Sequence, residues 1–375
     1  MTDAPTDAPT DAPGDDAVTS SGRVVDRAGR GEWTEPGAFE VAPGVHRMPL
    51  PLPMDGLRAV NVYVIETDDG LVLVDGGWAI PESRALFDSG LAALGYTARD
   101  VRRFLVTHMH RDHYTQASVV GREVGAPVSL GLGDRATMEL MHSGALGGER
   151  VEDPNVTRLR EAGAEHLASR WNELMPRRPE ALDDYGMPDE WLDRDLVVDL
   201  GARSLDAVAT PGHTQGHYVF ADTAGGLLFA GDHVLSTITP SIGFEPAYVR
   251  QPLRDYLSSL AKVRAMPDLR LLPAHGPVTE SSHTRIDELV AHHDVRLRQS
   301  LEAVEAGAGT AWEVAGLLPW TRHERTREEL GPFDAVLASF ETLAHLELLA
   351  LQARVRRLDG PTVRFAPLLP PAAPS

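Results

Sequence analysis

The sequence predicts an α/β protein that carries a small, mainly helical domain at its C-terminal end. Three observations lead to this prediction. Between residues 36 and 282, short apolar runs alternate with amphipathic helical segments, in two similar halves. Histidine and aspartate recur where several of these apolar runs end. After residue 283 the pattern changes to long helical stretches. The chain therefore divides into a larger α/β domain, 36–282, and a smaller domain, 283–366.

Both ends of the chain predict tails outside these domains. Residues 1–35 begin with three copies of Thr-Asp-Ala-Pro and hold few apolar side chains, so burial offers little to offset the entropy of ordering them. We expect this stretch to be a disordered tail. Residues 367–375 are rich in proline and predict a second tail.

The first half of the α/β domain contains clear strand and helix signals. Apolar runs at 45–50, 60–66 and 70–75 predict strands, and the last two predict a hairpin. Proline opens an amphipathic helix at 81–94. A buried strand at 101–107, a helix at 117–126 and a short strand at 127–131 follow.

A long segment, 134–195, separates the two halves and is rich in helix-forming residues. We expect a helical lid over a functional site, and the alternative is a set of helices that packs elsewhere. Its arginines could grip a phosphate or carboxylate of a substrate, or could pair with nearby acidic residues on solvated faces. The large apolar side chains are Met138, Met141, Leu159, Leu167, Trp171, Leu174, Met175, Tyr185 and Trp191, and the arginines are Arg158, Arg160, Arg170, Arg177 and Arg178.

The second half alternates again and leads into the C-terminal domain. Strands are predicted at 205–210, 217–222, 226–230 and 269–272, with a helix at 253–266. Helices at 284–305, 310–317 and 333–352 are followed by two short strands, at 353–357 and 362–365, that resemble a wing. Acidic residues outnumber arginines here, whereas a winged helix that reads DNA is normally basic. Packing, capping of the site or dimerisation fits this domain better.

The strongest functional signal is the stretch Thr107–His113. It contains His108, His110, Asp112 and His113 in the pattern H-x-H-x-D-H. Imidazole nitrogens and carboxylate oxygens are ligands for Zn²⁺ and similar divalent ions. A solvated histidine-rich loop is the alternative, but further candidates recur at the ends of later apolar runs, namely His213, Asp232 and His275. The series predicts a metal site in loops at strand ends.

The motifs T-H-x-H-x-D-H, P-G-H-T-x-G-H, F-x-G-D and P-x-H-G resemble those of the metallo-β-lactamase superfamily. Within it, the pattern is most similar to glyoxalase II and to lactamase-like hydrolases with a C-terminal winged-helix-type domain. The resemblance covers residues 40–280 well. It implies a four-layer αβ/βα sandwich with the ligands on loops at strand ends.

The resemblance also implies how two metal ions would be held. One ligand set is His108, His110 and His213, the other is Asp112, His113 and His275, and Asp232 bridges the two ions. Zinc is expected, with iron or manganese as alternatives. The ions would hold a hydroxide for attack on a carbonyl, with Asp112 as the catalytic residue, and would polarise that carbonyl. Asp75, His217 and His233 are expected to support the ligands without binding metal.

Charge and cysteine content limit the other expectations. The net charge of −20 argues against a nucleic-acid partner. Without cysteine there is no disulfide, and neither a signal peptide nor an apolar run of membrane-spanning length is present, so a cytoplasmic protein without membrane contact is expected. The expected partner is a small-molecule or carrier-bound acyl substrate, and a homodimer is possible.

The expected activity is hydrolysis of a thioester, as in hydroxyacylglutathione hydrolases or acyl-thioesterases. The sequence offers no recognisable acid for a leaving group, which favours a thiolate because it departs unprotonated. Alternatives from the same superfamily are a lactone or β-lactam hydrolase, a single-iron persulfide dioxygenase and an endoribonuclease. A non-catalytic binding protein is disfavoured because all seven ligands are present.

Overall fold

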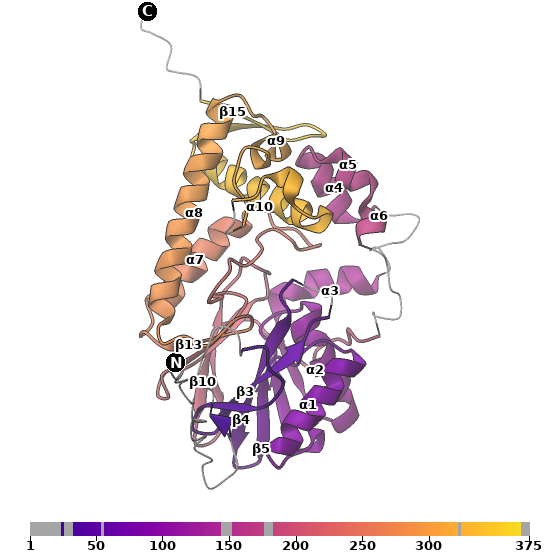
Figure 1. The fold of residues 1–375 in the computed structure, drawn as a ribbon, viewed down its shortest axis with the longest axis vertical. Coiled ribbons are helices and arrows are strands. Elements are labelled where there is room, and N and C mark those ends of the chain that lie inside the picture. The colour runs from indigo at the N-terminus through magenta and orange to yellow at the C-terminus, as the bar shows by residue number, and fades with distance from the viewer. Residues whose placement is uncertain are drawn as a thin grey trace, which may run out of the picture.

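Two β-sheets packed face to face form the centre of the protein, and helices cover both outer faces (Figure 1). This computed structural model describes residues 24–25, 33–53, 56–143, 152–175, 183–321 and 324–368. The arrangement confirms the predicted α/β class and the four-layer sandwich with a helical C-terminal region. Within the described residues, no helix is long and apolar enough to cross a membrane.

The first sheet has its eight strands in sequence order, β1 to β8. Strands β2 to β5 are antiparallel neighbours, whereas β5 to β8 run parallel and have helices between them. The strands are β1 (Val24–Val25), β2 (Phe39–Ala42), β3 (Val45–Pro51), β4 (Ala59–Thr67), β5 (Gly70–Val74), β6 (Val101–Leu105), β7 (Val128–Gly131) and β8 (Glu190–Leu192).

The second sheet has five strands in the order β13-β12-β11-β10-β9. Its inner face packs against the first sheet through a buried apolar layer that includes Tyr63, Leu105, Phe220 and Phe229. The strands are β9 (Leu196–Asp199), β10 (Ser204–Ala209), β11 (Tyr218–Asp222), β12 (Leu227–Gly231) and β13 (Arg270–Pro273). β12 and β13 are parallel, so both deliver the residues after them to the same edge of the sheet.

Helices on each outer face bury one apolar side against their sheet. α1 (Pro81–Ala93), α2 (Arg111–Val124) and α3 (Arg135–His142) contribute to the core on the first sheet. α7 (Pro252–Arg264), α8 (Ser282–Glu305) and α10 (Pro332–Leu351) contribute to the core on the second. Local sequence sets their ends: Gly125 closes α2 at a φ of 74°, a left-handed value that favours glycine, and Ser281 caps α8 by accepting a hydrogen bond from the Thr284 amide.

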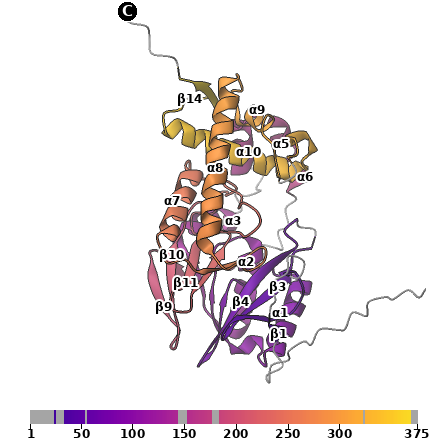
Figure 2. The same cartoon turned by 60° about the vertical axis from the view of Figure 1, so that its left-hand side comes forward.

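The helices of the segment between the two halves pack against the C-terminal region (Figure 2). These are α4 (Pro154–Glu161), α5 (Glu165–Ser169) and α6 (Trp171–Leu174). Leu159, Leu167 and Trp171 are buried there against Val336 and Phe340 of α10. α9 (Ala311–Ala315) and the hairpin of β14 (Val355–Leu358) and β15 (Arg364–Pro367) complete this region, and short 3₁₀ turns lie at Ala98–Asp100, Leu132–Asp134 and Arg327–Glu329.

Several local expectations differ from the structure. The helix expected at 117–126 begins earlier, at Arg111, because the metal-motif residues form its first turn. Strand β8 lies inside the segment predicted to be helical, 134–195, and the short strand β9 directly follows that segment without having been predicted. The predicted tails fall largely outside the described residues, and within the first of them Val24–Val25 pairs with β2.

Candidate metal centre

Four of the candidate ligands follow β6 and lead into α2. His108 lies in the loop, His110 is the residue just before the helix, and Asp112 and His113 are on its first turn. The sequence predicts that all four residues lie in a loop. For Asp112 and His113 this prediction is wrong, because both lie in the first turn of α2. The helical turn fixes the spacing of these two side chains more rigidly than a loop would. The carboxylate of Asp112 also lies near the partial positive charge of the helix N-terminus.

The other three candidate ligands come from the second sheet. His213 lies in the turn after β10, Asp232 directly follows β12, and His275 follows β13. The structure brings these three side chains against the four from the first half. All seven are buried or nearly so, although more than a hundred residues separate the first from the last.

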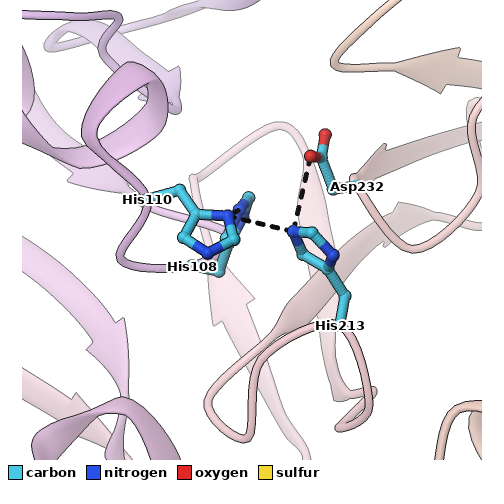
Figure 3. A group of neighbouring side chains, drawn as sticks. All are labelled: His108, His110, His213 and Asp232. Carbon is cyan, nitrogen blue, oxygen red and sulfur yellow. Dashed lines mark hydrogen bonds and ion pairs between the residues drawn. The ribbon is translucent and has the colours of Figure 1, made fainter. Parts of the chain in front are cut away.

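The first cluster contains His108, His110, His213 and Asp232 (Figure 3). Nδ1 of His110 lies 2.9 Å from Nε2 of His108 and 3.0 Å from Nε2 of His213. An oxygen of Asp232 lies 3.5 Å from Nε2 of His213. Nitrogens from three separate imidazoles and one carboxylate oxygen therefore converge, and the four ligand atoms all lie within 4.8 Å of one another.

The second cluster contains Asp112, His113 and His275, whose ligand atoms also lie within 4.8 Å of one another. Nε2 of His275 is 3.4 Å from an oxygen of Asp112, and Nε2 of His113 is 3.6 Å from the same oxygen. Oδ1 of Asp232 lies 3.4 Å from Nε2 of His275 and 3.6 Å from Nε2 of His113. Asp232 thus contacts both clusters, one through each oxygen.

Buried polar atoms at the centre fit bound cations. Nε2 of His113, Nε2 of His275 and Oδ1 of Asp232 are buried and have no hydrogen-bond partner within the described chain. Leaving such groups unpaired costs free energy, so the arrangement calls for a further group that binds lone pairs. Neutral imidazole and carboxylate are the ligands that zinc and similar divalent ions take.

Hydrogen bonds on the far side of each ring hold the imidazoles in a ligand orientation. Nδ1 of His213 donates to the Ser241 carbonyl at 2.7 Å, and Nδ1 of His275 donates to the Ala59 carbonyl at 2.7 Å. A ring that donates from Nδ1 has its lone pair on Nε2, the nitrogen that faces the centre. Both rings are therefore set for metal binding before any ion arrives.

The electrostatics of the two clusters differ. Burial, followed by the imidazole of His213, lowers the pKa of His110 to about 3, and burial also lowers the pKa of His108, so these rings are neutral. Burial alone would raise the pKa of Asp112, but the imidazoles of His113 and His275 outweigh it and hold that pKa below its usual range. The first cluster thus offers neutral imidazoles. In the second, burial is outweighed by the neighbouring carboxylates: Asp112 and Asp75 raise the pKa of His113 to about 10, and Asp232 raises that of His275, so a metal ion that binds there must displace protons from these two rings.

A comparison with protein families assigns the chain. The model of the metallo-beta-lactamase superfamily matches residues 55–275, which is more than half of the sequence and includes all seven candidate ligands. The chain belongs to the metallo-β-lactamase superfamily. Members of this superfamily are generally hydrolases and typically bind two metal ions, and the two side-chain clusters agree with that description.

Two solved structures of the superfamily resemble this protein over most of their length. A metallo-beta-lactamase family protein of Thermus thermophilus is 27% identical, with a TM-score of 0.66 over 88% of this chain and 100% of that one. A beta-lactamase domain protein from Burkholderia ambifaria is also 27% identical, with a TM-score of 0.67 over 88% and 95%. Because both extend beyond residues 55–275, they support the whole architecture.

Among curated relatives, the similarity is lower or shorter. A beta-lactamase-like protein 2 homolog of Caenorhabditis elegans is 23% identical over 249 residues, and lactamase-like protein vrtG of Penicillium aethiopicum is 35% identical over 101 residues. This chain spans 66% of the length of the first and 30% of the second. These similarities agree with the superfamily assignment. They do not identify the substrate of this protein, which must be inferred from its own site.

Asp75 supports the metal loop of this metallo-β-lactamase superfamily member from behind. Its carboxylate accepts from the Thr107 amide at 2.8 Å, from the Thr107 hydroxyl at 3.1 Å and from Nδ1 of His113 at 2.8 Å. The residue itself adopts a φ of 63°. Asp75 is therefore hydrogen-bonded to one candidate ligand, His113, and to the first residue of the loop, Thr107.

His217 and His233 both lie behind the ligands. Nδ1 of His217 donates to the Thr210 hydroxyl at 2.9 Å, and its Nε2 accepts from the Asp232 amide at 3.1 Å, so both nitrogens are engaged. His233 is fully buried, packs edge-on against Tyr256 and belongs to neither cluster. His217 therefore positions Asp232 through its backbone, whereas His233 has no contact with a ligand side chain among the described interactions.

The segment 134–195 uses most of its described side chains for packing and pairing. Arg160 pairs with Glu152 and Glu165, and Arg170 pairs with Glu173. These pairs agree with the alternative in which the arginines pair with nearby acidic residues on solvated faces. Arg158 is buried and binds backbone carbonyls. Arg177 and Arg178 lie outside the described residues. The described arginines therefore give no support to a binding site for an anionic carrier.

Sequence reasoning missed several residues around the centre. Asp134 binds the Met109 amide of the metal loop. Like the candidate ligands, it follows soon after a strand, β7, and this position is a signal that the sequence does contain. Glu245 lies in an irregular segment that carries no motif. In the sequence, Tyr185 is marked only by its large apolar ring. In the structure it lies close enough to Asp112 for that carboxylate to affect the pKa of its phenol.

Proposed function

We propose that this protein is a dinuclear metal-dependent hydrolase that cleaves thioesters. The observation that carries the proposal is the convergence of seven ligands in two clusters beside side chains that cannot readily supply a proton. Asp75 and His217 are fully engaged by their own hydrogen bonds. Burial raises the pKa of Tyr185, and Asp112 raises it further, so this phenol holds its proton. A thiolate leaving group needs no proton from the enzyme.

Bound metal ions and the carboxylate of Asp112 would have separate roles in the reaction. Divalent ions, when bound, lower the pKa of a coordinated water and polarise the carbonyl under attack. The ionised carboxylate of Asp112 then accepts a hydrogen bond from the attacking water and fixes its direction. Water adds to the carbonyl carbon, the C–S bond breaks, and sulfur leaves with the bonding electron pair as thiolate. The products are a carboxylate and a thiolate; the two protons of the water pass to the solvent, from which the thiolate takes one to become a thiol.

The test is a matched pair of substrates that differ only in the leaving atom. An S-ethyl and an O-ethyl ester of the same acyl group should be compared by kcat/KM, using metal-loaded protein. We expect the thioester to react about 100-fold faster or more, because an alkoxide of much higher basicity must be protonated as it leaves. The chelated protein serves as the blank.

Each alternative activity has its own outcome in the same screen. Faster cleavage of a lactone, a β-lactam or a phosphodiester than of the thioester would replace the proposal with that activity. Oxygen uptake with a persulfide by protein that holds one iron per chain would make it a dioxygenase. Equal rates on the sulfur and oxygen esters would remove the argument based on the leaving group.

A further inference from the structure

A buried carboxyl group joins the two loops that carry the histidines of the first cluster. Asp134 is fully buried after β7. Its Oδ2 accepts from the Met109 amide at 2.9 Å, and its Oδ1 accepts from the Gly216 amide at 2.7 Å. Met109 lies between His108 and His110, and Gly216 closes the turn that begins at His213. One side chain thus fixes the separation of the two loops.

A second buried carboxyl group holds the adjacent amide of the same turn. Oε2 of Glu245 accepts from the Gln215 amide at 3.1 Å, and Oε1 accepts from the Thr137 hydroxyl at 3.1 Å. The consecutive amides of Gln215 and Gly216 are therefore bound by carboxyls from two different segments. Backbone amides of buried turns need such partners, and here side chains supply both.

Close backbone packing supports the same contact independently. A Cβ added at Gly133 would lie 2.1 Å from the Gln215 carbonyl oxygen, and one added at Gly216 would lie 2.5 Å from Cγ of Asp134. Only glycine allows the end of β7 and the His213 turn to approach this closely. This close approach keeps Asp134 beside the turn whose Gly216 amide it binds.

The segment that presents Glu245 is itself fixed by distant parts of the chain. Arg158 of α4 donates to the carbonyls of Gly243 at 2.5 Å and Glu245 at 2.7 Å. Its guanidinium lies 4.0 Å from the ring centre of Tyr248 and 5.1 Å from that of Phe340 in α10. The Ser241 carbonyl, which orients His213, belongs to the same segment. The inserted helices and α10 therefore support the ligand loops through a continuous set of contacts.

We propose that Asp134 and Glu245 are positioning residues, which hold the His108–His110 loop and the His213 turn at the separation that a metal ion requires. This inference rests on the metal-dependent part of the proposed function and not on the thioester. Burial raises the pKa of both carboxyls, and Asp134 raises that of Glu245 further. A neutral amide should therefore replace Glu245 well.

The two carboxyls offer a matched pair of conservative variants. Each oxygen of Asp134 accepts from a backbone amide that can only donate, and the Thr214 hydroxyl also interacts with the carboxyl. In Asp134→Asn the new NH₂ group therefore faces one of the two amides, and that contact is lost. In Glu245→Gln the amide oxygen can still accept from Gln215, while the NH₂ donates to the Thr137 hydroxyl. Glu245→Ala removes both contacts and completes the set.

Zinc affinity, measured by competition with a chromophoric chelator, is the main measurement because it does not depend on the substrate. We expect Asp134→Asn to bind zinc about 10- to 100-fold more weakly, the usual effect of removing a group that orients ligands, with Glu245→Gln close to wild type and Glu245→Ala weaker. In metal-free protein, amide hydrogen exchange in 107–113 and 212–217 should be faster in Asp134→Asn. Turnover should fall more than KM changes.

The outcomes separate this inference from the proposed function. Wild-type affinity in Asp134→Asn would overturn it, as would equal affinities in Glu245→Ala, Glu245→Gln and wild type. If Asp134→Asn does not fold, judged by circular dichroism, the two Glu245 variants decide the question. Wild-type protein that bound no zinc or other divalent ion would overturn metal dependence itself. Failure to cleave thioesters would leave the positioning role intact.

Discussion

Replacing His110 with alanine is expected to remove activity down to the level of the chelated protein. Nδ1 of His110 lies within 3.0 Å of both other imidazole nitrogens of the first cluster, so no remaining side chain can take its place. The ion held there should be lost with it. Elemental analysis should find about two divalent ions per chain in wild type and at most about one in the variant, as a two-ion centre requires.

An exposed histidine provides the control for this experiment. His166 lies on α5, belongs to neither cluster, and its ring contacts that of Trp312. His166→Ala should keep the metal content and turnover of wild type. Full metal content in His110→Ala, or a wild-type protein with a single tight ion and no second site on titration, would contradict the assignment of the clusters.

Asp112→Asn is expected to lower kcat by about 100- to 10,000-fold while KM changes little, because a positioned proton acceptor contributes in this range. The substitution keeps the shape of the side chain but removes the ionised carboxylate that faces His113 and His275. Its contact with the attacking water strengthens as the transition state forms, so the loss should appear in kcat and kcat/KM together.

Steady-state kinetics with the metal content matched between proteins will test this effect. The exposed Asp88→Asn on α1 is a suitable control, because it removes a carboxylate that pairs with Arg84 and belongs to neither cluster. Turnover of Asp112→Asn within a few-fold of wild type would remove Asp112 from the catalytic role. A rise in KM alone would make it a substrate-binding residue.

The fold and the clustering of the candidate ligands were predictable because their signals are local. Strand β12 is a continuous apolar run, and β6 ends in the buried residues Phe104 and Leu105; each strand is followed within a few residues by a histidine or aspartate. Hydrophobic periodicity and ligand chemistry can be read directly from such stretches. The position of Asp112 on α2 was harder, because the motif residues themselves begin the helix.

The roles of Glu245 and Arg158 could not be predicted because their partners come from tertiary packing. Glu245 binds the Gln215 amide, a backbone group that no sequence pattern marks. Arg158 looked like a candidate anion binder on a helix surface, and only the packing of α4 against α10 reveals that it is buried among carbonyls. A buried arginine and an exposed one have the same local sequence signal.

The position of the ligands on both sheets has a consequence for the unfolded chain. His110 and His213 belong to the same cluster but come from opposite halves of a protein without cysteine, so an ion that both of them bind would join distant points of the chain much as a disulfide does. Closing a loop of roughly a hundred residues in this way can remove chain entropy worth about 4–5 kcal/mol from the unfolded state. Thermal unfolding with and without chelator should therefore show a lower transition temperature for the stripped protein, and identical curves would exclude such a cross-link. Metal supply would then govern the lifetime of the folded protein as well as its rate of catalysis.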